Sequence, residues 1–294
     1  MANTVITERP SWLKKRLAAA GAEFEARKIL SEEGVLTVCE SALCPNRNEC
    51  FANKQATFLL LGDICTRDCS FCSVKRGVPR APDNTEPARI AEAARRLDIR
   101  YAVVTSVTRD DLEDGGARQF ADVIGSLRSS SRAIKVEILT PDFKGDPEAL
   151  RRVIEARPDV FGHNIETVGR LYPTVRSGAG YRRSLGLLRR AKDIRASQLT
   201  KSSIMVGLGE GENDILAAMR DLREAGCDIL TIGQYLRPAQ ANIPVSRYVT
   251  PEEFEKYKES AVRLGFRYVA SGPFVRSSYM AEKIYTTINR RQIL

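Results

Sequence analysis

The chain has 294 residues, long enough to bury the core of one large α/β domain or of two smaller ones. No apolar stretch approaches the roughly 18 residues of a membrane span, so we expect no membrane contact. The net charge is +9, but the 46 basic residues are interspersed with 37 acidic ones, and no basic run is interleaved with aromatics. We therefore expect solvated helix faces and no binding to nucleic acid.

The first 56 residues contain three closely spaced cysteines and no recognisable secretory signal. The opening string MANTVITERPSWLKKRL lacks the apolar core that export requires. Cys39, Cys44 and Cys50, the Cys39 triad, follow in the string CESALCPNRNEC. Because disulfides need an oxidising compartment, we expect free thiols in a reducing cytoplasm.

A second group of three cysteines, the Cys65 triad, follows the first predicted strand directly. Cys65, Cys69 and Cys72 stand in the string CTRDCSFC, with the spacing C-x3-C-x2-C. A closed [4Fe–4S] cubane takes four cysteine ligands, so three thiolates leave one iron open to a substrate or cofactor. Two groups of three therefore indicate clusters that take part in chemistry.

Zinc and a ferredoxin-type cluster are the alternatives for these cysteines. Structural zinc sites favour cysteine pairs two to four residues apart, and the single histidine, His163, cannot complete both groups. Bacterial ferredoxins use C-x2-C-x2-C with a distant fourth cysteine before a proline. The spacings thus favour iron–sulfur clusters over zinc. Cys227, between a predicted helix and an apolar strand, is expected to be a small buried hydrophobe.

From residue 57 onward, apolar runs alternate with amphipathic helical patterns. The runs are rich in Val, Ile and Leu, as expected of a parallel sheet covered on both faces. They predict strands at 57–62, 101–106, 134–140, 160–164, 202–207 and 229–233. The patterns between them predict helices at 86–97, 117–129, 146–156, 181–195 and 212–224. Thr85 with Pro87, and Asp146 with Pro147, mark helix starts, and Gly226 marks a stop.

Six βα units are too few for a closed eight-stranded barrel. They fit either an open partial barrel or a doubly wound sheet, and the pattern alone does not separate the two. In both folds the chemistry belongs at the carboxyl ends of the strands. The loop Cys65–Cys72 follows the first strand at that end.

Three strings of the sequence resemble those of a known family. C-x3-C-x2-C with an aromatic residue, Phe71, before the last cysteine is the signature of the radical S-adenosylmethionine (SAM) superfamily. CESALCPNRNEC and SGPFVRSSY resemble two elements of the lipoyl synthase family, and the similarity extends from about Trp12 to Tyr279. Phe51 departs from the family pattern, which has Trp there, and NKQ at 53–55 replaces small residues. These departures concern local packing or carrier docking and leave the cluster ligands intact.

The resemblance implies a partial (β/α)6 barrel of the TIM type, with N- and C-terminal extensions that cover the barrel mouth. Residues 1–56 would be the N-terminal extension with the auxiliary-cluster cysteines, and 57–249 the radical SAM barrel. Residues 250–294 would be the C-terminal extension with the RSSY segment (276–279). We expect the two extensions to meet, because both carry family elements of the auxiliary site.

The resemblance also implies two [4Fe–4S] clusters. The Cys65 triad would hold the cluster whose open iron binds SAM, which is cleaved to methionine and a 5′-deoxyadenosyl radical. The Cys39 triad would hold an auxiliary cluster that is sacrificed as the sulfur source. Its fourth ligand would be Ser278, with Ser277 as the fallback, since a serine oxygen holds such iron more weakly than a thiolate. Arg276 would hydrogen-bond the cluster or a carboxylate. Without the resemblance, RSSY reads as an ordinary polar turn.

SAM itself is expected to contact the ends of later strands. Asn164 and Glu166 end the fourth predicted strand, Arg176 stands in YPTVRSGAGY, and Glu210 ends the Gly-rich string SSIMVGLGE. For each of them the alternative is a capping or turn residue. His163 is expected to be a packed, hydrogen-bonded core residue.

The implied function is lipoyl synthase: insertion of two sulfur atoms at carbons 6 and 8 of an octanoyl group on a carrier lysine. The implied partners are octanoylated carrier domains of 2-oxoacid dehydrogenase complexes or glycine cleavage H protein, an electron donor of ferredoxin or flavodoxin type, and an iron–sulfur carrier protein. We expect a monomer. One alternative is a radical SAM enzyme whose auxiliary cluster transfers electrons; another is a non-catalytic iron–sulfur carrier, which would need no barrel.

Overall fold

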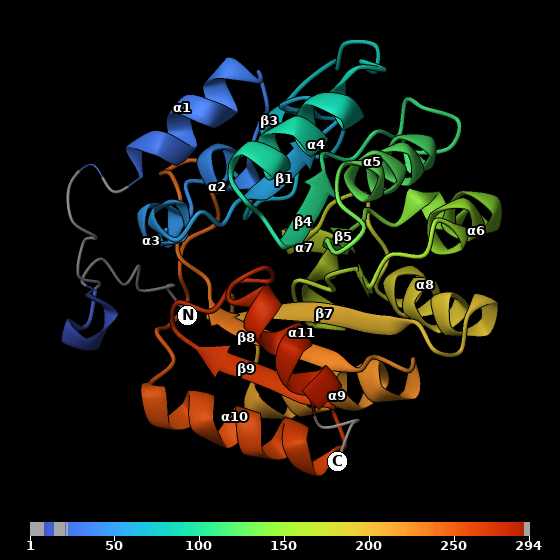
Figure 1. Ribbon diagram of the computed structural model, residues 1–294. Coiled ribbons are helices and arrows are strands. Elements are labelled where there is room, and N and C mark those ends of the chain that lie inside the picture. Colours follow the sequence, from blue (N-terminus) through green and yellow to red (C-terminus); the bar gives the residue numbers. More distant parts are fainter. Residues whose placement is uncertain (1–8, 15–20, 22, 291–294) are drawn as a thin grey trace.

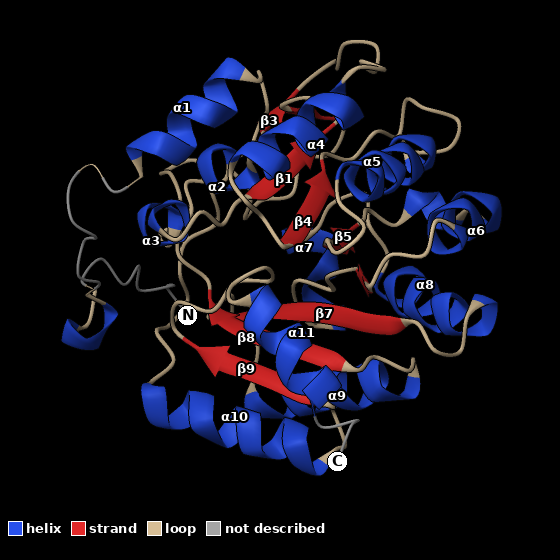
Figure 2. Cartoon of the chain, viewed as in Figure 1, coloured by secondary structure: helices blue, strands red, loops and turns tan. Residues whose placement is uncertain are grey.

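A computed structural model of the chain describes residues 9–14, 21 and 23–290, so parts of the ranges 1–56 and 250–294 lie outside the described residues. A parallel sheet curves around the centre of the molecule, and helices cover its outer side (Figures 1 and 2). Among the helices of these described ranges, none combines the length and apolar character needed to cross a membrane.

Strands and helices alternate through most of the described chain. The strands are β1 (Thr57–Leu60), β2 (Ile64–Cys65), β3 (Lys75–Arg76), β4 (Tyr101–Ser106), β5 (Lys135–Leu139), β6 (Val160–Gly162), β7 (Leu199–Val206), β8 (Ile229–Gln234) and β9 (Tyr268–Gly272). The helices are η1 (Ser11–Leu13), α1 (Phe24–Glu32), α2 (Val38–Ser41), α3 (Arg47–Ala52), α4 (Glu86–Arg96), α5 (Ala117–Ser130), η2 (Phe143–Gly145), α6 (Pro147–Glu155), η3 (Gly169–Leu171), α7 (Tyr172–Val175), α8 (Tyr181–Ile194), α9 (Glu212–Glu224), α10 (Pro251–Arg263) and α11 (Ala281–Arg290).

The main sheet has the order β1-β4-β5-β6-β7-β8-β9, and each neighbouring pair is parallel. Strands that follow one another in the chain lie side by side in this order, which is the arrangement of a partial barrel and differs from that of a doubly wound sheet. The predicted fold class is confirmed, and so are the six predicted strands and five predicted helices. Their bounds differ by a few residues; β7, for example, begins at Leu199.

The seventh strand, β9, is an addition to the prediction. It continues the sheet beyond β8 by pairing in parallel, with Ile229 opposite Tyr268 and Gly233 opposite Gly272. Only one of its five residues, Val269, is buried. An edge strand with little burial carries a weak apolar pattern, and for this reason the sequence did not indicate it.

Local signals explain where several helices begin and end. The Asp146 side chain accepts a hydrogen bond from the backbone N–H of Glu148, and Pro147 follows at the first helical position of α6. Gly226 has a φ of +81°, which stops α9 at little steric cost. Thr85 precedes α4 without capping it by its side chain. Its hydroxyl and N–H instead bond to Asp83.

Helix α11 packs against the amino ends of the central strands. Ile284 and Ile288 form a buried cluster with the first residues of three strands, Val160, Leu199 and Ile229. Above this cluster a buried ion pair joins Lys201 of β7 to Glu137 of β5 at 2.7 Å. The lower end of the barrel is therefore filled, and open space lies toward the carboxyl ends.

The two terminal extensions meet, as predicted. The Asn46 side-chain amide donates a hydrogen bond to the Phe274 carbonyl at 2.7 Å, and the Tyr279 hydroxyl bonds to Glu49 at 3.0 Å. Phe51, at the position where the family has Trp, is 1% exposed and belongs to the main core. Segments more than 200 residues apart thus form one unit beside β1.

Candidate active site

A cavity of roughly 600 Å³ lies at the carboxyl ends of the strands. The Cys65 triad lines it from the loop after β1, and Thr108, Pro141 and Asn164 line it from the segments after β4, β5 and β6. Cys39, Cys44 and Ser278 line the same space. The fold therefore brings the Cys65 triad, two members of the Cys39 triad and Ser278 to one cavity, although 14 residues separate the triads and about 200 separate them from Ser278.

The loop of the Cys65 triad is tied to the barrel along its length. The Thr66 hydroxyl donates to the Thr108 carbonyl at 3.0 Å, and the Ser70 N–H donates to the Val175 carbonyl at 3.1 Å. The side chain of Asn242 donates to the carbonyl of Cys72 at 2.8 Å. Each bond joins the loop to a different segment, so the loop has a fixed path before any ligand binds.

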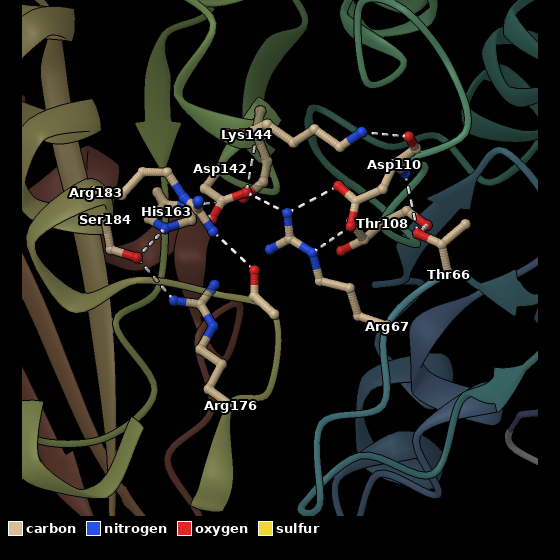
Figure 3. A network of polar contacts seen from close by, with 12 residues as sticks. Thr66, Arg67, Thr108, Asp110, Asp142, Lys144, His163, Arg176, Arg183 and Ser184 are labelled. Atoms are coloured by element: carbon tan, nitrogen blue, oxygen red, sulfur yellow. Dashed lines mark hydrogen bonds and ion pairs between the residues drawn. The ribbon is translucent and has the colours of Figure 1, made fainter. Parts of the chain in front are cut away.

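Arg67, inside the same loop, forms ion pairs with residues of the barrel (Figure 3). Its guanidinium bonds to Asp110 and to Asp142, each at 2.7 Å. Arg183 bonds to the second oxygen of Asp142, also at 2.7 Å. Burial alone would raise the pKa of Asp142, but its bonds with Arg67 and the charge of Arg183 hold that pKa well below its usual range. The carboxylate therefore stays charged and keeps the loop attached.

Arg176 reaches the cavity from the other side of this network (Figure 3). Its guanidinium donates to the Ser184 hydroxyl and to the Tyr172 hydroxyl, each at 3.0 Å. His163 lies behind it and bonds to Ser184 and to the Thr140 carbonyl, both at 2.9 Å. A carbonyl can only accept, so Nδ1 of His163 carries the proton. His163 is thus the packed core residue that was expected, and it supports Arg176 through Ser184.

The Cys39 triad and Ser278 line a second, smaller cavity of roughly 50 Å³. Thr37 caps α2 by accepting from the Glu40 N–H, which places Cys39 in the first turn of that helix. Cys50 lies on α3, and Ser278 accepts a hydrogen bond of 2.8 Å from the Thr57 hydroxyl at the start of β1. Three thiols and one hydroxyl therefore line one cavity, and these are the four predicted ligands of the auxiliary cluster.

The donor atoms at both sites are of the kind that holds iron–sulfur clusters, namely three thiols at each site and one hydroxyl at the second. All seven cysteines are free thiols, and in the described part of the chain no three Cys, His, Asp or Glu side chains are close enough to share one ion. Four irons and four sulfides separate the ligands of a cubane, so these ligands stand farther apart than those of zinc. Burial raises the pKa of Cys39 and of Cys72 to about 11. A metal that binds there must displace protons.

Asn164 and Glu166 lie together on the cavity wall. The Asn164 amide donates to the Glu166 carboxylate at 2.9 Å, and the Ser277 hydroxyl donates to the Asn164 carbonyl oxygen at 3.1 Å. Burial raises the pKa of Glu166, against the opposing influence of Arg176 and Asn164. The wall thus offers a polar patch beside the cationic Arg176.

Glu210 is the predicted contact residue that the structure does not bring to the cavity. Its carboxylate accepts hydrogen bonds from the backbone N–H groups of Gly207 and Leu208 and closes the turn after β7. In this structure Glu210 is therefore a turn residue, which was the alternative to a contact with SAM. Cys227 is fully buried in the main core, as expected of a small hydrophobe.

Comparisons with known proteins agree with this geometry. Residues 59–222 match the family model of the Radical SAM superfamily. The lipoyl synthase of Caldicellulosiruptor saccharolyticus is 52% identical over 277 residues, covering 94% of this chain and 97% of that protein. The lipoyl synthase of Rubrobacter xylanophilus is 53% identical over 275 residues, covering 94% and 86%.

The chain belongs to the lipoyl synthase family. It is accordingly a radical SAM enzyme of the sulfurtransferase class, as the resemblance implied. Among solved structures, methylornithine synthase aligns with a TM-score of 0.54 at 16% identity, over 87% of this chain and 71% of that one. HydG, a maturase of the [FeFe]-hydrogenase, aligns with a TM-score of 0.53 at 13% identity, over 90% and 74%. These two likenesses concern the fold alone.

Sequence reasoning missed the residues that hold the family motifs in place. Arg67, Asp110 and Asp142 are charged residues in loops, which usually indicate solvent exposure, yet Asp142 is fully buried. Asn46 and Asn242 likewise read as ordinary turn residues. The available signal was position: each follows a strand end or lies beside a cysteine.

Proposed function

We propose that the chain inserts sulfur into a protein-bound octanoyl group inside the larger cavity, using [4Fe–4S] clusters held by its two cysteine triads. One observation carries the proposal: Cys39, Cys44, Cys65, Cys69 and Cys72 line the same cavity. A substrate in that cavity would be within reach of both sites without leaving the protein.

At the Cys65 triad, the proposed task of the chain is to hold SAM in one orientation. When bound there, a [4Fe–4S] cluster offers one open iron to SAM and supplies the electron that cleaves it. Arg176 presents a guanidinium that suits the carboxylate of SAM, while Asn164 and Glu166 present polar atoms from the end of β6.

At the Cys39 triad we assign the fourth ligand position to Ser278. Its hydroxyl lines the smaller cavity with the three cysteines, whereas the Ser277 hydroxyl is turned to Asn164. A cluster bound there would supply the sulfur. Serine oxygen is a poor partner for such iron compared with thiolate, which suits a site that must release its contents.

The remaining cavity wall supports an acyl group as the substrate, and membership of the lipoyl synthase family supports its attachment to a carrier domain. Apolar side chains suited to an acyl chain contribute much of this wall, namely Val38, Leu43, Leu59, Val107, Leu139 and Val275. We assign as substrates the octanoylated carrier domains of 2-oxoacid dehydrogenase complexes or of glycine cleavage H protein. A ferredoxin- or flavodoxin-type donor and an iron–sulfur carrier protein would serve the clusters. A monomer in a reducing cytoplasm meets these requirements.

We retain the division into an extension at 1–56, a barrel at 57–249 and an extension at 250–294. The last range contributes more than a cover, since β9 extends the barrel sheet and α10 packs against β9 before the RSSY segment begins. Truncation after residue 249 would therefore expose the edge of β8 as well as remove Ser278.

The deciding experiment is a turnover assay on anaerobically reconstituted protein. With reductant, SAM and an octanoylated carrier peptide, we expect 5′-deoxyadenosine and lipoylated peptide, with loss of iron from the Cys39 triad. Deoxyadenosine without sulfur insertion, and with the second cluster intact after turnover, would overturn the proposal. That result would leave an enzyme whose auxiliary cluster transfers electrons.

A further inference from the structure

Ser277 and Ser278 are neighbours in the chain, but their hydroxyl groups serve different sites. Ser278 accepts from Thr57 at 2.8 Å and lines the smaller cavity with the Cys39 triad. Ser277 donates to the side chain of Asn164 at 3.1 Å, at the end of β6. The RSSY segment therefore touches both sites at successive positions, about 3.8 Å apart along the backbone.

The hydrogen bond from Ser277 continues toward the larger cavity. Asn164, which is 7% exposed, in turn donates a hydrogen bond from its amide nitrogen to the Glu166 carboxylate at 2.9 Å. Both donors point toward the Glu166 carboxylate, so each bond polarises the next. The chain Ser277–Asn164–Glu166 thus runs from the RSSY segment to the wall beside Arg176.

The far end of this chain is held rigidly. Glu166 has a φ of +64°, a left-handed conformation that is costly for a residue with a side chain. Its N–H donates to the Ser203 carbonyl at 3.0 Å, and its carbonyl accepts from the Met205 N–H at 2.8 Å. Strain fixed by β7 in this way keeps the carboxylate in one place.

The backbone at the Ser277 end of this chain of hydrogen bonds has little room to move. The RSSY segment follows Val275, whose carbonyl oxygen would lie only 2.1 Å from a Cβ added to Gly233 of β8. The Arg276 guanidinium donates to the same Val275 carbonyl at 2.7 Å. A shift of Ser277 therefore moves Ser278 as well, because the backbone beside them cannot absorb it.

We propose that Ser277 is a positioning residue that couples SAM binding at the Asn164–Glu166 wall to the placement of Ser278 at the auxiliary site. This inference rests on the proposed function, because it uses the SAM and ligand roles assigned there. Coupling between two sites is reciprocal. A ligand against Asn164 and Glu166 steadies the RSSY segment, and loss of the auxiliary site weakens SAM binding.

The test compares SAM affinity with and without the auxiliary site. SAM dissociation constants are measured by equilibrium dialysis without reductant, so that no turnover occurs, on reconstituted protein of known iron content. Replacing all three residues of the Cys39 triad with Ala should weaken SAM binding about three- to tenfold, the range of one hydrogen bond. In a Ser277→Val background the same replacement should change the affinity by less than about twofold.

Matched variants separate the hydroxyl from its surroundings. Ser277→Thr has the shape of Ser277→Val but keeps the hydroxyl, so it should retain the wild-type coupling. Ser271→Ala removes a similar half-buried hydroxyl on β9, which donates to the Phe254 carbonyl at 2.7 Å outside the cavity. It should also retain the coupling.

Three results would overturn the inference. Equal coupling in the Thr and Val variants would show that the hydroxyl carries none of it. No effect of the Cys39 triad on SAM affinity would show that the sites are independent. Iron loss in Ser277→Val equal to that of the triad variant would make Ser277 a ligand instead. Failure of wild-type protein to form lipoyl product is a separate result, which contradicts only the proposed function.

Discussion

The two cysteine sites are built in different ways. The Cys65 triad stands on a loop fixed by barrel segments, with Arg67 bonded to Asp110 and Asp142 at 2.7 Å. The Cys39 triad stands where two terminal extensions meet, with hydrogen bonds between them such as those from Asn46 to Phe274 and from Tyr279 to Glu49.

The difference matches the proposed work of each site. A site that cleaves SAM in every turnover gains from a preorganised frame, because fixed ligands need no rearrangement during the reaction. A site that gives up its sulfur must be emptied and refilled. Two terminal extensions can separate locally while the parallel sheet of the barrel stays intact.

The largest expected effect comes from removing one triad or the other. Cys69→Ala should abolish deoxyadenosine formation, since three thiolates hold the cluster that SAM needs. Replacing all of the Cys39 triad with Ala should abolish lipoyl product and keep deoxyadenosine, with iron falling from about eight to about four per chain. Iron and acid-labile sulfide analysis, beside a product assay, checks both. About four irons in the native protein would mean that only one of the two triads holds a cluster, and the comparison of two cluster sites would no longer apply.

The next effect concerns the frame of the barrel site. Arg67→Met leaves the buried Asp142 with Arg183 as its remaining ion-pair partner, so the free energy of unfolding should fall by about 3 kcal/mol. Urea denaturation of the cluster-free protein measures this. Arg76→Met is the control, because its ion pair with Asp68 is exposed and should matter little. Similar small decreases in the free energy of unfolding for both variants would contradict the conclusion that the ion pairs of Arg67 hold the loop in place.

A smaller effect belongs to the same frame. Burial, helped by the charge of Arg176, lowers the pKa of His163 to about 3, while an unfolded histidine titrates near 6.5. Below about pH 6.5 the histidine binds a proton in the unfolded state but stays neutral in the folded state, so the free energy of unfolding falls as pH falls. Between pH 7 and pH 5 the loss should be about 2 kcal/mol.

The control for this pH effect is simple because His163 is the only histidine. His163→Gln should lack the pH-dependent term, and the difference between the two urea denaturation profiles isolates it from carboxylate titration. Parallel profiles for the two proteins between pH 7 and pH 5 would mean that His163 is protonated in the fold.

The smallest effect separates the two sites at a single hydroxyl. Ser278→Ala should lower lipoyl formation about tenfold and leave deoxyadenosine formation within about twofold, because it removes the proposed fourth ligand of the auxiliary site alone. Product analysis by mass spectrometry gives both values from one reaction. Equal loss of both products would place Ser278 in the shared frame and weaken the distinction between the two sites.

The sequence pattern predicted an α/β fold, the family resemblance carried by its motifs predicted the partial barrel, and the structure and comparisons confirm the fold and the family. The strands of the central barrel are apolar and buried, so their sequence pattern is strong. β9 was not predicted because Val269 is its one buried residue. The cysteines have diagnostic spacing. Glu210 was selected from its Gly-rich context, which describes a SAM-binding turn and an ordinary one equally well.

By itself, the sequence determined the family and the strands of the barrel, and it predicted which cysteines carry the chemistry, since metal ligands and buried strands leave spaced or periodic patterns along the chain. Only the tertiary structure decided that Ser278 faces the Cys39 triad while Ser277 faces Asn164, and that Arg67 is held by two carboxylates. Contacts across 221 residues, such as that of Thr57 with Ser278, depend on how the barrel folds the chain back. No local pattern encodes them, because polar residues in loops serve turns, caps and sites alike.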